Sequence, residues 1–458
     1  MFVPELFMLL SDIGRARRRL VCIAAILLSG LPACAQIGKT SLDNEASYGD
    51  EAPYAIGSFR NEEISRSDEI IRETSPVGIA MFNMAWAGTV DDFKHHAEIC
   101  SAPEVNWCGS RAKISRGTLH PVPEEAARAA KCQEAFMAAA GGFDAAMMVA
   151  PCTAYGIRRT RKPPGMEEMI ENYHLKLGGL RATVEDLIQN KKIRVIAFQE
   201  IKSKEVIEQV LGKFSGQFDI CVAPHNAFQT VAFAWDKAIP MGASRCTTNP
   251  ELALAENPAS KFTRVRPGLA LELVINGLPV TFMNVHLKSG CANLKTAHGF
   301  PGHKLTDPQP ACVVLNRQIP ILEDWVEHIA RQSPRFVLLG DFNRRIDEEA
   351  RARVPRGEVR ADGSDPVGVN TRDELGGVKS DYLWQEIDDG KPSMYQVALT
   401  STEPGCTGFK GLDHIVISGP IRRTQAAAPS SSKMALIKNE GQRIVTSDHC
   451  PRITVLEL

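Results

Sequence analysis

Five short segments of the chain end in polar side chains of the kinds that cleave phosphate esters with a divalent cation. Each segment directly follows an apolar, strand-like run, which predicts that these side chains sit at strand ends. A sixth segment, GLDHIVIS, begins an apolar run. Carboxylate and amide oxygens are hard ligands for Mg²⁺, and histidines can transfer protons. The ordered set therefore predicts metal-assisted hydrolysis of a phosphoester, and its residues are Asn83, Glu200, Asn284, His286, Asp341, Asn343, Asp413, Asp448 and His449.

Alternating strands and helices must hold these residues in place. The apolar runs predict an α/β fold, in which helices cover a sheet and the candidate site lies at the strand ends. Two helices are predicted, over 166–189 and 315–331. The predicted strands cover 78–82, 195–198, 230–235, 269–275, 280–286, 336–339, 412–417 and 453–456.

The first 75 residues are predicted to lie outside the folded domain. A basic stretch and the run LVCIAAILLSGLPACAQ are typical of a signal peptide over 1–35, which indicates a secreted or periplasmic protein. Lipid anchoring at Cys34 and an uncleaved anchor helix are the alternatives. Residues 36–75 are polar and are predicted to form a linker. The formal charge of −1 excludes binding to nucleic acid through bulk positive charge, although a local basic cleft would be enough for a nuclease.

Cysteine usage agrees with export. Twelve cysteines occur, and ten remain after the predicted signal peptide, an even number that suits an oxidising compartment. Pairing of sequence neighbours closes the shortest loops, whereas free buried thiols are the alternative. The expected pairs are Cys100–Cys108, Cys132–Cys152, Cys221–Cys246, Cys291–Cys312 and Cys406–Cys450.

The ordered motifs resemble those of the endonuclease/exonuclease/phosphatase superfamily, over residues 76–458. The resemblance implies a four-layered α/β sandwich, with two mostly antiparallel sheets packed face to face and flanked by helices. It also implies Mg²⁺ or Mn²⁺ as the cofactor. Regions 91–165 and 344–405 are expected to be insertions near the site, where loops select the substrate.

The resemblance also implies a role for each residue. Glu200 would be the main metal ligand, with Asn83 and Asp448 beside it. Asp341 would orient or deprotonate the attacking water, and Asn343 would hold a phosphate oxygen. His449, supported by Asp413, would be a general base or stabilise charge, whereas His286 would protonate the leaving oxygen. Asn284 would bind phosphate, and Arg266, which precedes a predicted strand, could clamp it.

The interpretation is a metal-dependent phosphoesterase, with nucleic acid as the first choice of substrate. A phospholipid or sugar-phosphate esterase of sphingomyelinase-like or inositol-phosphatase-like type is the alternative. A non-catalytic binding or toxin subunit on the same fold is the third hypothesis, and the intact motif set argues against it. No protein partner is predicted.

Overall fold

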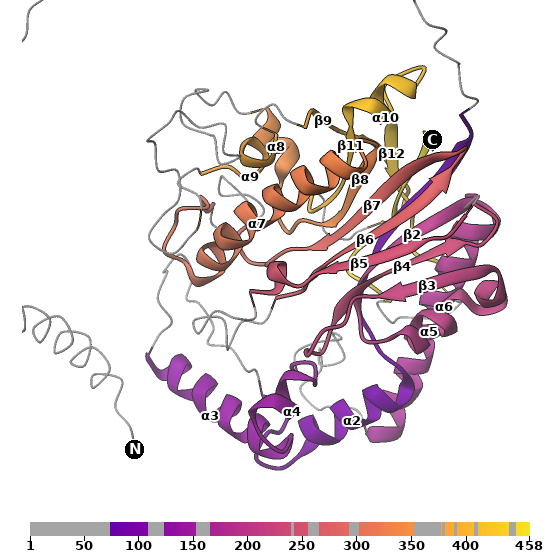
Figure 1. Ribbon diagram of the computed structural model, residues 1–458. Coiled ribbons are helices and arrows are strands. Elements are labelled where there is room, and N and C mark those ends of the chain that lie inside the picture. The colour runs from indigo at the N-terminus through magenta and orange to yellow at the C-terminus, as the bar shows by residue number, and fades with distance from the viewer. Residues whose placement is uncertain are drawn as a thin grey trace, which may run out of the picture. The chain divides into compact units, whose positions relative to one another are not determined.

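The structure is a computed structural model, and the residues that it describes all lie within Ile70–Leu458 (Figure 1). The predicted signal peptide and nearly all of the predicted linker lie outside the described residues. The described ranges are 74–108, 123–152, 165–239, 242–254, 265–292, 302–351, 377, 381–388, 392–406, 411–438 and 446–458.

A seven-stranded sheet forms one half of the domain, in the order β10-β12-β13-β1-β2-β4-β3. Its two central strands, β1 and β2, run parallel, and β13 pairs antiparallel with the other edge of β1. The first and last strands of the domain therefore meet in this sheet. Its strands are β1 (Pro76–Ala87), β2 (Ile193–Ile201), β3 (Phe218–Val222), β4 (Thr230–Asp236), β10 (Ala398–Thr402), β12 (Ser430–Lys433) and β13 (Arg452–Glu457).

A six-stranded sheet forms the other half, in the order β5-β6-β7-β8-β11-β9. Here β7 and β8 run parallel and the other neighbours are antiparallel. The strands are β5 (Arg245–Asn249), β6 (Gly268–Ile275), β7 (Leu278–His286), β8 (Phe336–Asp341), β9 (Met394–Gln396) and β11 (Asp413–Ser418).

Three apolar cores show how the layers are stacked. The first lies between the two sheets and takes alternate residues from both, such as Phe233 and Phe282. The second joins the six-stranded sheet to α7 (Pro310–Gln332), and the third joins the seven-stranded sheet to α5 (Met166–Gln189) and α6 (Lys204–Leu211). The layers therefore follow the order helix, sheet, sheet, helix. This order confirms the predicted four-layered α/β sandwich.

Shorter helices occupy the regions predicted as insertions. In the first region, α2 (Val90–Ser101), α3 (Pro123–Ala139) and α4 (Phe143–Met147) share a small aromatic core. The second region contains α8 (Ile346–Ala350) and α9 (Leu383–Ile387), but it also contributes β9 and β10 to the sheets. Helix α10 (Gly419–Thr424) follows β11, and short 3₁₀ helices cover Gly212–Gln217 and Glu251–Ala253. Among the described residues, no helix is long and apolar enough to span a membrane.

Each predicted strand overlaps an observed strand, and the helix predicted over 166–189 coincides with α5. The helix predicted over 315–331 begins five residues earlier, at Pro310, because Gln309 caps it by accepting a hydrogen bond from the amide of Cys312. Five observed strands, β3, β5, β9, β10 and β12, were not predicted. They are short, and β5, β10 and β12 have the sequences RCTTN, ALTST and SSSK, with none of the apolar alternation that marks a half-buried strand.

Five disulfides pair the ten described cysteines. Three of the predicted pairs are confirmed, namely Cys221–Cys246, Cys291–Cys312 and Cys406–Cys450. The other two predictions are wrong, because the structure pairs Cys100 with Cys152 and Cys108 with Cys132. Neighbour pairing considers only loop length, whereas here α3 and α4 return the chain to α2, so that one bridge is nested inside the other.

Candidate active site

The strand register brings three predicted residues side by side at one end of the six-stranded sheet. His286 ends β7 and is the direct partner of Asp341 at the end of β8. Asp413 begins β11 and is the direct partner of Asp341 on its other side. Because β7 pairs parallel with β8 and β11 pairs antiparallel with β8, residues that are far apart in sequence lie together at one end of the sheet.

Asn83 links this edge to the seven-stranded sheet. Its amide nitrogen donates to Glu200 Oε1 at 3.2 Å and to Asp341 Oδ2 at 3.0 Å, and its amide oxygen accepts from the Ala85 amide at 2.9 Å. The Glu200 side chain is 26% exposed, whereas that of Asp341 is 2% exposed. The buried Asn83 amide therefore holds the two carboxylates close together, and of the two only the Glu200 carboxylate is partly exposed to solvent.

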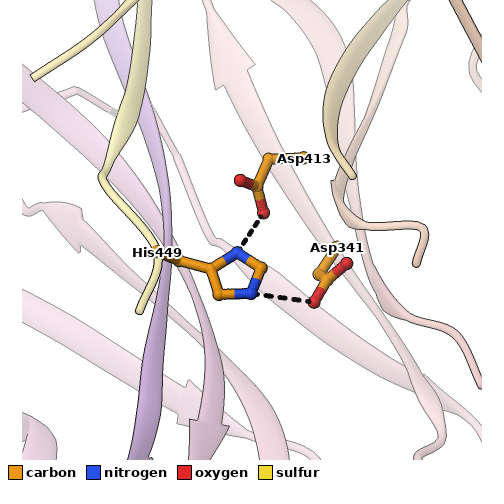
Figure 2. A group of neighbouring side chains, drawn as sticks. All are labelled: Asp341, Asp413 and His449. Carbon is orange, nitrogen blue, oxygen red and sulfur yellow. Dashed lines mark hydrogen bonds and ion pairs between the residues drawn. The ribbon is translucent and has the colours of Figure 1, made fainter. Parts of the chain in front are cut away.

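His449 completes the group from the segment before β13. Its Nδ1 donates to Asp413 Oδ1 at 2.9 Å, and its Nε2 lies 3.8 Å from Asp341 Oδ2; Figure 2 shows the ring between the two carboxylates. Burial alone would lower the pKa of His449, but the Asp413 carboxylate and the other acidic groups raise it to about 10. His449 is therefore an imidazolium at neutral pH in this structure.

A buried lysine stands behind Asp413. Lys433 on β12 is fully buried and donates to Asp413 Oδ2, so both carboxylate oxygens of Asp413 carry a hydrogen bond from a cationic partner. Burial would raise the pKa of Asp413, but His449 and Lys433 together hold it well below its usual range. The ligand-type atoms of Asp341, Asp413 and His449 lie within 4.8 Å of one another. Because both Asp413 oxygens accept hydrogen bonds, we interpret Asp413 as the residue that holds the His449 ring beside Asp341, and not as part of a metal ligand set.

The turn after β8 aims the Asp341 carboxylate. Its Oδ1 accepts from the Asn343 amide at 2.8 Å, and Asn343 has a left-handed backbone with φ 52°. Gly340 has φ 141°, and a Cβ there would lie 2.0 Å from the Val285 carbonyl oxygen, so only glycine fits. Burial raises the pKa of Asp341 to about 7, against the lowering effect of His449.

His286 lies on the far side of the same carboxylates. Its Nε2 is 3.5 Å from Glu200 Oε1 and 3.6 Å from Asp341 Oδ2. Its Nδ1 is buried and has no hydrogen-bond partner among the residues that the structure describes. Burial lowers the pKa of His286 well below its ordinary value, and the nearby Arg266 and His449 add to this. The ring is therefore neutral here. Arg266 donates to the His286 carbonyl at 3.0 Å and to that of Leu287, so its guanidinium holds the backbone that carries the ring.

Besides Arg266, two residues that were expected to bind phosphate have their side-chain amides bonded to other parts of the protein. Asn284 lies between the sheets, where its amide nitrogen donates to the carbonyls of Phe198 and Ala232 and its oxygen accepts from Gln199 at 2.8 Å. Asn343 donates its side-chain amide to the Leu287 carbonyl at 3.0 Å. Asp448 is exposed beside the group, where its charge helps to raise the pKa of His449.

Several residues that support the group were not predicted from the sequence. Lys433 is the clearest case, together with Ser447, whose hydroxyl donates to the Asn83 carbonyl at 2.7 Å and accepts from the His449 amide at 3.0 Å. Gln199, which bonds to Asn284, is a third. The sole sequence signal for Ser447 is its place in SDH, and the polar run SSSK gives none for a buried lysine.

A scan against protein-family models and a search of curated proteins found no match. A search of solved structures found truncated TDP2 from Caenorhabditis elegans, 15% identical, covering 62% of this chain and 91% of that chain with a TM-score of 0.37. It also found an endonuclease/exonuclease/phosphatase family protein from Bacteroides thetaiotaomicron that is 11% identical. That match covers 84% of this chain and 96% of that chain, with a TM-score of 0.39. A mannosyl-6-phosphatase from the same organism is 12% identical. That match covers 64% of this chain and 96% of that chain, with a TM-score of 0.37.

At these identities and TM-scores, the substrates named for those proteins say nothing about the substrate of this chain.

Proposed function

We propose that the chain is a divalent-metal-dependent phosphoesterase of the endonuclease/exonuclease/phosphatase type. The observation that carries the proposal is the contiguous group of Asn83, Glu200, Asp341, His449 and Asp413, which is joined by hydrogen bonds and by the 3.8 Å ion pair between His449 and Asp341. The His286 ring lies against the carboxylates of Glu200 and Asp341. Its residues come from both sheets, and nearly all of its polar atoms are buried. Buried clusters of carboxylates and imidazoles with shifted pKa values are typical of active sites.

The donor set fits a hard divalent cation. Glu200 Oε1 and Asp341 Oδ2 face the same amide nitrogen, and both are carboxylate oxygens, the ligands that Mg²⁺ and Mn²⁺ prefer. We assign the cation to Glu200, with the exposed Asp448 as a further ligand, and Asp341 is left to act on the attacking water. Asn83 presents its NH₂ group to both carboxylates, so we assign it to holding the ligands in place. A bound cation supplies positive charge to the phosphoryl oxygens in the transition state.

The protein residues have distinct roles in water attack on phosphorus. Asp341, with a pKa of about 7, is suited to accept the proton of the attacking water near neutral pH. The His449 imidazolium, fixed by Asp413, can stabilise the negative charge that develops on the phosphoryl oxygens. His286 can protonate the leaving oxygen only as an imidazolium, and the carboxylates of Glu200 and Asp341, 3.5 and 3.6 Å from its Nε2, would stabilise that protonated form. Water thus forms the new P–O bond, and the leaving group departs as an alcohol.

We propose that the substrates are phosphodiester bonds of nucleic acid. Support comes from His286, because a nucleoside alkoxide is a poor leaving group that needs a proton, and this ring lies beside the reacting carboxylates. We also place the mature protein outside the cytoplasm, supported by the five disulfides among the described residues.

One panel assay tests both the chemistry and the substrate. The purified protein is incubated with Mn²⁺ or Mg²⁺ and, separately, plasmid DNA, RNA, sphingomyelin and an inositol phosphate. We expect cleavage of nucleic acid that stops with EDTA and returns with added Mg²⁺. Asp341→Asn should abolish turnover, and Asp219→Asn, which changes an exposed carboxylate on the edge strand β3, should not. Full turnover in EDTA would refute the proposal that the reaction needs a metal. Cleavage of the lipid or the inositol phosphate alone would refute nucleic acid as the substrate.

A further inference from the structure

Two strained backbone segments meet at the Glu200 carboxylate. Strand β1 shifts its register against β2 between Asn83 and Ala87, and within this bulge Ala85 and Trp86 have φ values of 47° and 56°. Glu200 itself has φ 58°, at a register shift between β2 and β4. Non-glycine residues avoid this left-handed region, so such positions persist only where their surroundings hold them.

A single peptide group in this bulge connects Glu200 to helix α5. The Trp86 amide donates to Glu200 Oε2 at 2.9 Å. The carbonyl of the same peptide belongs to Ala85, and it accepts from Lys176 Nζ at 2.6 Å. An ammonium on the carbonyl end of a peptide polarises it, which strengthens the N–H at its other end as a donor. Lys176 therefore acts on the Glu200 carboxylate through one peptide bond.

Helix α5 also holds the end of the bulge. The Tyr173 hydroxyl donates to the Gly88 carbonyl at 2.7 Å and accepts from the Gly88 amide at 2.9 Å. Tyr173 is one helical turn before Lys176, so both reach the bulge from the same face. Phe93 of α2 stacks on the Tyr173 ring with centroids 4.2 Å apart, and the Trp86 indole donates to the Phe228 carbonyl at 2.9 Å.

Burial of Lys176 is difficult to explain by packing alone. The residue is 3% exposed, and a buried ammonium is costly unless its charge is compensated. Burial lowers the pKa of Lys176 to about 8, while the charges of Glu200 and Asp448 oppose this, so the group is an ammonium at pH 7. Both acidic residues are ligands in the proposed function.

We propose that Lys176 and Tyr173 are positioning residues for the metal site, which hold the Ala85–Gly88 bulge so that the Trp86 amide fixes the ligand Glu200. This inference rests on the proposed function, because it assigns a cation to Glu200. Residues that orient metal ligands typically change metal affinity by about 10–100-fold when they are removed.

The sign of the effect separates positioning from simple electrostatics. A positive charge near a cation site repels the cation, so if charge alone mattered, Lys176→Met would tighten metal binding. Loss of positioning frees the strained bulge and leaves the Glu200 carboxylate without its fixed donor, so metal binding would weaken. The two hypotheses predict opposite changes in Kd for the same variant.

Titration calorimetry with Mn²⁺ alone at pH 7 measures this change without any substrate. We expect Lys176→Met to raise the Kd by about 10-fold or more, and Tyr173→Phe to raise it in the same direction. The matched control is Thr183→Val, which also removes a buried polar group from α5. The Thr183 hydroxyl bonds to Gly179 and Ile437 and not to the bulge. The Kd of this variant for Mn²⁺ should therefore equal that of the unmodified protein.

Each outcome decides a different hypothesis. Tighter or unchanged Mn²⁺ binding by both Lys176→Met and Tyr173→Phe would overturn the positioning role while leaving the proposed function intact. Absence of Mn²⁺ binding by the unmodified protein would overturn both. If Lys176→Met does not fold, as judged by circular dichroism, Tyr173→Phe decides, because it removes one hydroxyl and retains the ring packing.

Discussion

Replacement of Asp413 by leucine should separate the stability of the site from its chemistry. Asp413 and Lys433 form a fully buried ion pair, so Asp413→Leu leaves the Lys433 ammonium in the interior without its carboxylate. Loss of one member of a buried pair typically costs about 3–5 kcal/mol, a large part of the total stability of a domain. His449 also loses the acceptor of its Nδ1 proton, at 2.9 Å, which costs about 1–3 kcal/mol.

The double variant Asp413→Leu with Lys433→Met removes the buried charge pair altogether. Replacement of a buried pair by apolar residues of similar volume is often neutral, so only the deficit of about 1–3 kcal/mol at His449 should remain. Turnover should stay depressed by about 100-fold or more, because His449 is no longer fixed. Urea unfolding and kcat/KM on a nitrophenyl phosphodiester measure the two effects. If turnover returns with stability in the double variant, Asp413 has no role in orienting His449.

The stability difference between the unmodified protein and the double variant should depend on pH. The pKa of His449 is raised from 6.5 to about 10, so its contribution is complete below pH 6.5 and is lost as the pH rises toward 10. The pKa of Asp413 is lowered from 3.8, so its contribution is complete above that value and is lost in stronger acid. The difference should therefore be largest between about pH 4 and 6.5. A flat profile from about pH 5 to 10 would show that the pair is not ionised as described.

Three further outcomes are expected. Gly340→Ala should destabilise the fold by at least about 1–3 kcal/mol and abolish turnover, because its Cβ would lie 2.0 Å from the Val285 carbonyl; thermal unfolding with normal Tm would contradict this. His286→Ala should greatly reduce cleavage of a nucleic-acid diester but reduce cleavage of a nitrophenyl diester much less, since nitrophenolate leaves without a proton; equal losses would exclude general-acid catalysis. Alkylation without reductant, followed by intact-mass measurement, should modify none of the ten described cysteines, and their modification would disprove the disulfides.

Sequence patterns were sufficient for the residues that end apolar strands. His286 and Asp341 follow runs of buried residues, and both end a strand as predicted. That they share one sheet edge follows from the pairing of β7 with β8, which the sequence did not predict. The same logic failed for Asn284, which has the right type and strand but points between the sheets. Its amide joins β7 to β2 and β4, and a contact between two sheets leaves no trace in the pattern of one strand.

Buried cations could not be predicted from the sequence. Lys433 belongs to a short polar strand, and Lys176 belongs to an amphipathic helix in which lysine normally faces water. Their partners, Asp413 and the Ala85 carbonyl, are 20 and 91 residues away. The pairing of Cys100 with Cys152 was missed for a related reason, since it depends on how α3 and α4 fold back and not on distance along the chain.

The place of β13 has a consequence for the order in which the domain can be built. The last strand of the sheet to be synthesised is inserted between β1 and β12, and Ser447 just before it bonds to Asn83, 364 residues earlier. A chain that folds from its N-terminal end therefore exposes one open edge of β1 until the C-terminal segment has joined the sheet. Open edges invite pairing with other chains, and such distant closure is slow. We expect the unfolded chain to need chaperone protection, and any chain that stops before His449 to lack both that histidine and the closed sheet.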